Sequence, residues 1–572
     1  MLFQAPDASP HRLVFIADPQ LVDPHTYPGR PWPLSALTVR HTDLYLRRAY
    51  KRIQTILYPD TIIFLGDLFD GGREWSTYDS ESPEERWRKF GNDFWLREYD
   101  RFGRIFFKLW GVAGTSPRPH QPGRKIISSL PGNHDLGFGS GIQPEVRKRY
   151  NAYFGDGNRI DVIGNHTFVS VDSVSLSALG QENWEKMSEL WKPARDFLDG
   201  AQANKKRLVQ EELRTHQGFP RTLPFVHREI PSHELARARL PQFNDYDVEF
   251  PTILLTHVPL YRSEGTPCGP LREHWPPTPP PKGQPPLEKD DRNAIAVRGG
   301  YQYQNVMTRE ITKEIAEKVG NIRYAFSGDD HDYCEVLHRG YASAGGGIRE
   351  ITVKSISWAM GVRHPGFLMA SMWNPVDELG NSLSEKTTLQ THLCLLPDQL
   401  GIFIRYANLF GVTLFALVVR ALLIMTGRIS SSIPTSTSAP ILPVSETSFF
   451  AESEKADTHV RNASSNDTTS SERGKLLIRN ANARTRGVSP SSGYGYPPGP
   501  SHQQGKFTYP LVQQAGYLSS EDMRDEKIGT SGRTRPRRPR NGLSVFWTEL
   551  RNSCASVALV VLPWYLWLIW KS

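Results

Sequence analysis

The ten residues Thr61-Ile-Ile-Phe-Leu-Gly-Asp-Leu-Phe-Asp70 decide the fold that the sequence predicts. The apolar run at their start has the length of a buried strand, and it ends at once in Gly66 and Asp67. Similar apolar runs recur along the chain, and each ends in a polar or glycine-containing loop. They occupy residues 12–17, 125–130, 251–255 and 322–327.

The first two of these runs flank a segment of helical character. In residues 37–57 the apolar positions recur at helical spacing, so the chain opens as β-α-β. This order predicts an α/β fold in which loops at the carboxyl ends of the strands carry the chemistry. Residues 183–218 are predicted to be helical, and residues 350–357 and 366–373 are predicted to be late strands.

The composition indicates one large domain with further segments. A chain of 572 residues with 38% hydrophobic residues exceeds the size that a single core normally reaches. The net charge is +8, but residues 428–551 hold 17 Lys/Arg against 11 Asp/Glu and so supply +6 of it. Because the basic excess belongs to this tail, we predict no nucleic-acid partner for the main domain.

The cysteines and the first residues bear on the cellular compartment. Cys268, Cys334, Cys394 and Cys554 follow none of the paired spacings of zinc modules. Cys268 and Cys334 could form a disulfide if the domain is lumenal, and two unpaired thiols are the alternative. Residues 1–10 have neither a charged start nor an apolar core, so no signal peptide is predicted there.

Beyond the main domain, predicted as residues 1–397, the composition changes several times. Residues 401–426 are apolar and long enough to cross a bilayer, with a buried core helix as the alternative. Residues 428–541 are Ser/Pro-rich, basic and predicted to be disordered. Residues 555–570 form a second apolar segment, either a span or an interfacial anchor.

Two membrane spans would define a topology. If both segments span, the basic loop between them faces the cytoplasm and the main domain faces the lumen. Asn165-His-Thr167 would then be a usable glycosylation sequon. The proline-rich residues 274–286 are predicted to form a surface loop.

Metal-binding residue types follow the five apolar runs in order. Each stretch puts an oxygen or imidazole ligand at a strand end, where the loops of an α/β sheet converge. The stretches are Ala17-Asp-Pro-Gln20, Gly66-Asp-Leu-Phe-Asp70, Gly132-Asn-His-Asp135, Thr256-His257 and Gly328-Asp-Asp-His-Asp332.

Over roughly residues 12–340 the order and spacing of these stretches resemble the calcineurin-like metallophosphoesterase superfamily. That pattern is D-x-H, G-D-x-x-D, G-N-H-[DE], H and G-H-x-H. The resemblance implies a four-layer α/β/β/α sandwich with two divalent metal ions. Asp67 would bridge them, since an anion between two dications offsets their repulsion. The first ion would be held by Asp18, Gln20, Asp67 and His331, and the second by Asp67, Asn133, His257 and Asp329.

The resemblance also implies catalytic residues and a metal preference. His134 would donate a proton to the leaving oxygen or steady the phosphoryl charge, and Asp70 would orient its imidazole. Gln20 and Asp329 stand where the family has histidine, and both still offer oxygen ligands. A site rich in hard oxygen favours Mn²⁺ or Mg²⁺ over Zn²⁺, and we expect Mn²⁺.

Residues 18–20, 66–73 and 328–331 narrow the resemblance to the fungal branch of membrane-anchored phosphodiesterases that remodel glycosylphosphatidylinositol (GPI) anchors. It implies hydrolysis of ethanolamine phosphate from a mannose of the GPI glycan, in the ER or Golgi membrane, in support of ER-to-Golgi transport. The catalytic domain of a multi-pass chain would be lumenal. No protein partner is predicted.

Other functions and one further residue remain open. A different phosphomonoesterase, a nucleotide phosphodiesterase, and a membrane scaffold with a degenerate metal site are the alternatives. Arg73, directly after Gly71-Gly72, could contact a phosphate oxygen or could be a surface arginine.

Overall fold

A computed structural model describes most of the chain. The described residues are 8–430 and 541–571, apart from 115, 118–120, 122, 222–230, 232–247, 274–292, 301 and 384–386. The predicted surface loop at 274–286 therefore lies outside the described residues, as does nearly all of the predicted disordered segment at 428–541.

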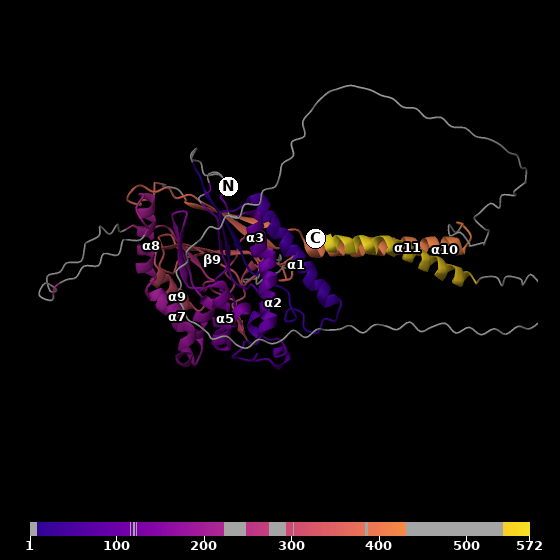
Figure 1. Ribbon diagram of the computed structural model, residues 1–572, viewed down its shortest axis with the longest axis horizontal. Helices are drawn as coiled ribbons and strands as arrows, with labels where there is room; N and C mark the ends of the chain where they lie inside the picture. The colour runs from indigo at the N-terminus through magenta and orange to yellow at the C-terminus, as the bar shows by residue number, and fades with distance from the viewer. Residues whose placement is uncertain are drawn as a thin grey trace, which may run out of the picture. The chain divides into compact units, whose positions relative to one another are not determined.

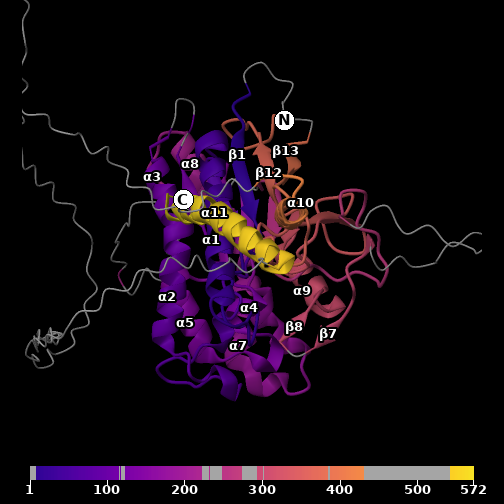
Figure 2. The ribbon, with the colours of Figure 1, turned by 90° about the vertical axis from the view of Figure 1, so that its right-hand side faces the viewer.

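A five-stranded sheet contains the opening β-α-β unit. Its strands β1, β2 and β3 are parallel, and the apolar residues of β1 and β2 are buried because both faces of the sheet are covered there. Figure 2 shows β1, β12 and β13 beside one another, in agreement with the strand order. In that order the strands are β13 (Leu389–Leu395), β12 (Gly366–Met372), β1 (His11–Ile16), β2 (Thr61–Phe64) and β3 (Lys125–Ile127).

A six-stranded sheet contains the predicted apolar runs at 251–255 and 322–327, which form its central strands β6 and β9. The sequence-based prediction missed β4, β5, β10 and β13. Strands β4, β10 and β13 are partly exposed, and three of the five residues of β5 are polar, so none of them forms an apolar run. The order is β10 (Cys334–His338), β11 (Ile348–Thr352), β9 (Ile322–Ser327), β6 (Thr252–Leu255), β5 (His166–Ser170) and β4 (Arg159–Ile163). A small ribbon pairs β7 (Gly299–Gly300) with β8 (Tyr303–Gln304).

The two sheets face each other across an apolar core. Phe15 from β1 stacks on Phe326 from β9 with ring centroids 4.2 Å apart. Leu13, Leu255 and Ile351 belong to the same fully buried cluster. Side chains from the opposite faces of the central strands pack under the helices, so strands such as β2 and β6 are buried on both sides.

Helices cover the outer faces of the sheets and complete the predicted α/β/β/α sandwich. In Figure 1, α7, α8 and α9 lie on one side of the strands, and α1, α2 and α3 lie on the other. Tyr50 of α1 packs on Phe106, which in turn packs on Phe64 of β2. The helices are α1 (Leu34–Arg52), α2 (Asn92–Phe102), α3 (Lys108–Ala113), α4 (Asn133–Leu136), α5 (Pro144–Phe154), α6 (Ser173–Leu176), α7 (Ser188–Asp199), α8 (Ala201–His216) and α9 (Arg309–Val319).

Cys268 and Cys334 form a disulfide, with their Cα atoms 4.3 Å apart. It ties the loop after β6 to the start of β10, and Arg262 contacts the Cys334 sulfur. The alternative of two unpaired thiols is therefore wrong at this pair. Asn165 of the sequon lies at the turn between β4 and β5, where its amide donates to the Asn374 carbonyl.

Two further helices are long and apolar enough to cross a membrane. Helix α10 (Gln399–Met425) covers nearly the predicted segment, and only 11% of its most apolar part is buried, which argues against a core helix. Helix α11 (Gly542–Lys571) starts 13 residues before the predicted apolar segment at 555–570. The candidate span within it, Gly542–Leu568, has 27 residues, so its length is sufficient for a bilayer.

Candidate active site

The five predicted motif stretches converge at the carboxyl ends of the parallel strands. Asp18 follows β1, Asp67 follows β2, and His257 follows β6. Asn133 and His134 open the short helix α4 after β3, and Asp329 and His331 follow β9. The seven side chains predicted as metal ligands are Asp18, Gln20, Asp67, Asn133, His257, Asp329 and His331, and we call them the ligand cluster.

At the centre of the ligand cluster lie Asp18, Asp67 and His257. One ligand atom from each falls within 4.8 Å of the others, a spacing that suits a metal ion. All three side chains are at most 1% exposed. Burial raises the pKa of Asp18 to about 7, with His331 and His257 pulling it back. Burial also acts to raise the pKa of Asp67, but the neighbouring His257 and His134 lower it below its usual range.

His257 is held in the orientation of a ligand. Its Nδ1 lies 2.8 Å from the Leu65 carbonyl oxygen, which can only accept, so Nδ1 carries the proton. In the neutral ring, the form that binds a metal, Nε2 then has the lone pair, and it lies 3.2 Å from Asn133 Oδ1 and 3.6 Å from Asp329 Oδ1. In metal-ligating histidines a hydrogen bond from the other ring nitrogen to a carbonyl group fixes the orientation and the tautomer of the ring. Burial lowers the pKa of His257, but the carboxylates of Asp67 and Asp329 raise it well above its ordinary value.

Gln20 and His331 complete the other side of Asp67. Gln20 Nε2 lies 2.6 Å from Asp67 Oδ2 and 3.2 Å from His331 Nε2. The amide nitrogen of Gln20 thus faces the point where its oxygen was predicted to coordinate. Oxygen coordination there needs a half-turn of the amide, which exchanges the two atoms at little change in shape.

Several residues of the ligand cluster have a strained, left-handed backbone conformation. Asp18, Gln20, Asp67, Asp329 and His331 all have positive φ, between 27° and 69°. Left-handed φ is uncommon in residues other than glycine and concentrates at functional sites. Two glycines allow the loops to approach: a Cβ on Gly132 would lie 2.0 Å from Asp67 Oδ1, and one on Gly66 would lie 2.5 Å from His257 Nδ1.

The residues present fit a metal centre. The buried carboxylates of Asp18 and Asp67 and the carboxylate of Asp329, which is 10% exposed, gather around one imidazole, and Asp18 Oδ2 is buried without a hydrogen-bond partner. A buried anionic oxygen without a partner costs several kcal/mol unless a cation compensates it. Oxygen and imidazole donors of this kind suit divalent ions.

His134 lies beside the ligand cluster with its proton position defined. Its Nδ1 is 2.6 Å from the main-chain oxygen of Asp70 and therefore carries a proton, which leaves Nε2 for proton transfer. The Asp70 carboxylate is farther, at 3.5 Å, so the main-chain oxygen rather than the carboxylate is the nearest orienting group. Burial and Arg73 lower the pKa of His134, partly offset by Asp67 and Asp70.

His25 is a site residue that the sequence-based prediction missed. Its Nδ1 lies 2.8 Å from Asp70 Oδ2, and its ring centroid is 6.0 Å from that of His134. These three side chains could also hold an ion, yet the short bond from His25 already occupies the Asp70 carboxylate. The available signal was its place five residues after Gln20, in the loop that follows the first strand.

Arg73 and Asp135 support the same loops. The surface alternative for Arg73 is wrong, because its side chain is 10% exposed and Nη1 donates to the Asn133 carbonyl over 3.0 Å. The buried Asp135 carboxylate accepts from the main-chain N–H groups of Leu68, Phe69 and Gly132. It thereby clamps the loop after β2 to the loop after β3, and burial raises its pKa to about 7.

Comparison with known proteins finds relatives that match part of the chain. The chain is 34% identical to Cell division control protein 1 of Saccharomyces cerevisiae over 68% of its own length and 62% of that protein. It is 24% identical to Metallophosphoesterase 1 of Mus musculus over 57% of its length and 62% of that protein. A solved dimetal phosphatase from Danio rerio aligns with 64% of the chain and 93% of its own, at 14% identity and a TM-score of 0.29.

The sequence matches one protein family over most of the α/β/β/α sandwich. The family is described as calcineurin-like phosphoesterase and matches residues 11–333, which contain all seven members of the ligand cluster together with His134 and Asp70. The prediction of a metal-dependent phosphoesterase is thus confirmed at the level of the family. With its motifs in order and its ligand atoms gathered at the carboxyl ends of strands from both sheets, this chain belongs to the calcineurin-like phosphoesterases.

Proposed function

We propose that this protein is a dinuclear-metal phosphodiesterase that removes ethanolamine phosphate from a mannose of the GPI glycan. The observation that carries the chemistry is the buried gathering of Asp18, Asp67 and His257 next to His134. The substrate is supported by the resemblance of residues 18–20, 66–73 and 328–331 to the GPI-remodelling phosphodiesterases. Similarity to Metallophosphoesterase 1 supports the phosphoesterase class.

The ligand cluster would hold two divalent ions, with Mn²⁺ expected from its oxygen-rich donors. When bound, the ions would act as Lewis acids that neutralise charge on the phosphoryl group. Asp67 is suited to bridge them, because Oδ1 faces His257 and Oδ2 faces Gln20. The other members would divide as predicted, with Asp18, Gln20 and His331 at one ion and Asn133, His257 and Asp329 at the other.

The side chains beside the cluster would handle the proton and the substrate. His134, fixed through Nδ1 by the Asp70 carbonyl, would hold at Nε2 the proton that the leaving mannose oxygen takes. His25 would keep the Asp70 loop in place through the Asp70 carboxylate. Arg73 would keep the Asn133 carbonyl in place and present its remaining N–H groups to a phosphate oxygen.

Membrane anchoring supports a substrate that is itself lipid-linked. We propose that α10 and α11 span the ER or Golgi membrane, that residues 428–541 between them are cytoplasmic, and that residues 1–397 are a lumenal catalytic domain. The arginine run at 533–540 directly precedes α11, as expected of a cytoplasmic flank. Arg420 lies 3.8 Å from Glu549, near the ends of the helices that this loop joins. The Cys268–Cys334 disulfide fits an oxidising compartment.

The full chain, purified in detergent and supplied with Mn²⁺, should release ethanolamine phosphate from a GPI glycan that carries it. The glycan mass before and after incubation is the measurement, beside an Asp67→Asn variant. If two ions bind and a simple phosphodiester is cleaved while the glycan stays intact, the enzyme class survives and the substrate is wrong. If neither metal nor turnover is found, the scaffold alternative replaces the enzyme.

A further inference from the structure

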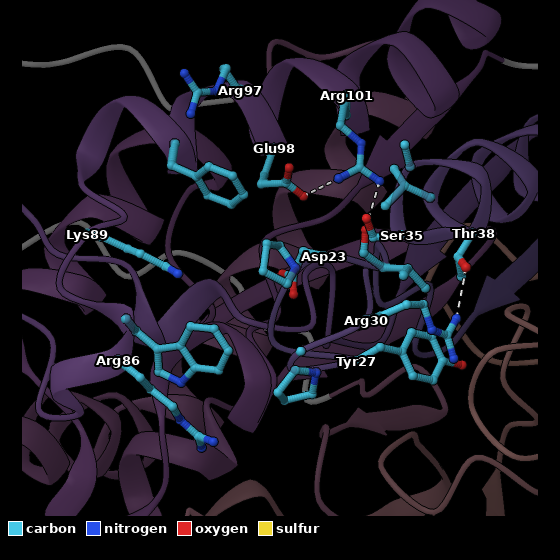
Figure 3. A pocket seen from close by; sticks show the side chains of 18 of the residues that line it. Asp23, Tyr27, Arg30, Ser35, Thr38, Arg86, Lys89, Arg97, Glu98 and Arg101 are labelled. Atoms are coloured by element: carbon cyan, nitrogen blue, oxygen red, sulfur yellow. Dashed lines mark hydrogen bonds and ion pairs between the residues drawn. The ribbon is translucent and has the colours of Figure 1, made fainter. Parts of the chain in front are cut away.

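A cavity of about 770 Å³ opens beside the candidate active site (Figure 3). Every wall comes from one stretch of chain between Val22 and Arg104, namely the loop after β1, the start of α1 and the segment that leads into α2. The volume is typical of a pocket for a small ligand. None of the ligand cluster lines this cavity, which we call the basic cavity.

Cations dominate the lining of the basic cavity. Arg30, Lys89 and Arg97 have no carboxylate at ion-pair distance among the residues that the structure describes. Arg30 is held in place, because its guanidinium stacks 3.6 Å above the Tyr27 ring and Nη1 donates to Thr38. In Figure 3 the Lys89 side chain extends toward the middle of the cavity, and Arg30 and Tyr27 lie across from it.

The acidic groups of the basic cavity are already engaged. Glu98 pairs with Arg101, which also binds Asp43 over 2.7 Å. Asp100 pairs with Arg104. Asp23 is 4% exposed and its carboxylate accepts from the main-chain N–H groups of Gly71 and His25. The charge left for a ligand is therefore positive, which favours an anion.

Aromatic rings line the same space. Tyr27, Trp87 and Phe94 all contribute to the wall, together with Pro24 and Pro28. Flat rings next to cationic side chains suit a ligand with a ring body and an anionic group, because the rings offer apolar contact and the cations offer charged hydrogen bonds.

Two lining residues of the basic cavity contact residues beside the reaction centre. The Trp87 ring lies 5.7 Å from the ring of His25, centroid to centroid, and His25 bonds the Asp70 carboxylate. Asp23, in the wall of the cavity, accepts from the N–H of Gly71, the residue after Asp70. A substrate with its scissile phosphoester beside His134 could therefore extend past His25 and Trp87 into the cavity.

We propose that the basic cavity is a second binding site for a phosphate-bearing sugar, in which a part of the glycan substrate remote from the scissile bond is held. This inference rests on the proposed function for the identity of the glycan. Arg30 and Lys89 would bind the phosphate from opposite walls, and the rings of Tyr27 and Trp87 would contact the sugar. The site would select substrates without taking part in bond cleavage.

The kinetic test uses the full chain in detergent with two substrates, the ethanolamine-phosphate glycan and bis(p-nitrophenyl) phosphate. The small diester has a single phosphate, so none is left for the cavity when that phosphate is at the reaction centre. In the double variant Arg30→Gln/Lys89→Gln, the ratio of kcat/KM for the glycan to kcat/KM for the small diester should fall at least about tenfold, since two charged hydrogen bonds are lost. The matched double variant Arg47→Gln/Lys51→Gln removes the same charge from exposed positions of α1 outside the cavity and should keep the ratio. An unchanged ratio in both doubles overturns the proposal.

A binding measurement separates this proposal from the proposed function. With metal removed by chelation, titration of the wild-type chain with mannose 6-phosphate should show binding that Arg30→Gln/Lys89→Gln weakens at least about tenfold, even if the glycan is never cleaved. Inorganic phosphate should bind more weakly because it offers nothing to the rings. Stronger binding to vesicles containing phosphatidylinositol than to the sugar phosphate would assign the cavity to a lipid headgroup and overturn the sugar assignment.

Discussion

The ligand cluster and the basic cavity meet at His25 and are built in opposite ways. The ligand cluster takes its members from loops after five different strands, so that Gln20 and His331 touch across 311 positions of sequence. The basic cavity takes all its walls from residues 22–104. A substitution in the ligand cluster affects loops from several strands at once, whereas a substitution in the cavity affects one segment of the chain. The chemistry thus depends on the packing of the whole sandwich, and the proposed specificity site depends on one segment.

The largest effect should come from the proposed bridging carboxylate. Asp67→Asn keeps the shape of the side chain but removes the charge, so we expect turnover of bis(p-nitrophenyl) phosphate to fall by more than about 100-fold, since loss of even an outer-shell partner costs 10–100-fold. Bound Mn²⁺, measured by elemental analysis, should fall in parallel. Asp79→Asn, an isosteric change at an exposed loop position, serves as control and should keep both. Full activity in Asp67→Asn would remove Asp67 from the mechanism.

Gly132→Ala tests whether the close packing of loops matters as much as charge. The added Cβ would lie 2.0 Å from Asp67 Oδ1 and 2.3 Å from the Asp67 nitrogen, so the loop after β2 has to move. A displacement of about 1 Å can cost about 100-fold in rate. Gly123→Ala is the matched control, because its Cβ meets nothing within 4 Å. Similar rates for the two alanine variants would show that the ligand cluster tolerates such movement.

A smaller effect is expected at His25, where the two regions meet. His25→Ala removes the bond to the Asp70 carboxylate and should lower kcat about tenfold for both substrates, with little change in KM. His25→Asn can place its amide nitrogen near the position of Nδ1 and should recover most of the rate. If the alanine variant instead raises KM for the glycan alone, His25 belongs to the basic cavity and not to the positioning of Asp70.

The smallest effect on activity is expected at His166, which lies in β5 away from both regions and bonds Thr388. Burial lowers the pKa of His166 to about 4. As pH falls below about 6.5 the unfolded chain takes up this proton before the folded chain does, so stability is lost between pH 6.5 and 4, by at most about 3 kcal/mol. His166→Gln should unfold with a weaker pH dependence over that window at unchanged metal content. Parallel pH dependence of the melting temperature in both proteins would contradict this.

Much of the fold followed from sequence because it depends on local pattern. The apolar runs at 12–17, 61–65, 251–255 and 322–327 are buried on both faces and correspond to β1, β2, β6 and β9. The amphipathic residues after 37 form α1, which begins three residues earlier, at Leu34. Strands with one exposed face, such as β13, carry a weaker pattern and were missed.

The candidate site likewise has features that the sequence predicted and features that only the structure shows. The sequence identified the donor residues that follow each strand, because loops at the carboxyl ends of the strands carry the chemistry of an α/β fold. The structure shows that these strands come from two sheets. The sequence could not show that the Asp70 carboxylate turns to His25 while its carbonyl holds His134, nor that Gln20 presents its amide nitrogen to Asp67. Those choices depend on distances between loops that only packing defines.

The sequence by itself determined the α/β class, the family motifs and the two apolar C-terminal segments, since each depends on residue type and spacing along the chain. Only the tertiary structure joined Cys268 to Cys334, buried Arg73, and enclosed a basic cavity next to His25. The physical reason is that these features need side chains from separate segments to meet at a few ångströms, and spacing along a chain does not specify distance in space.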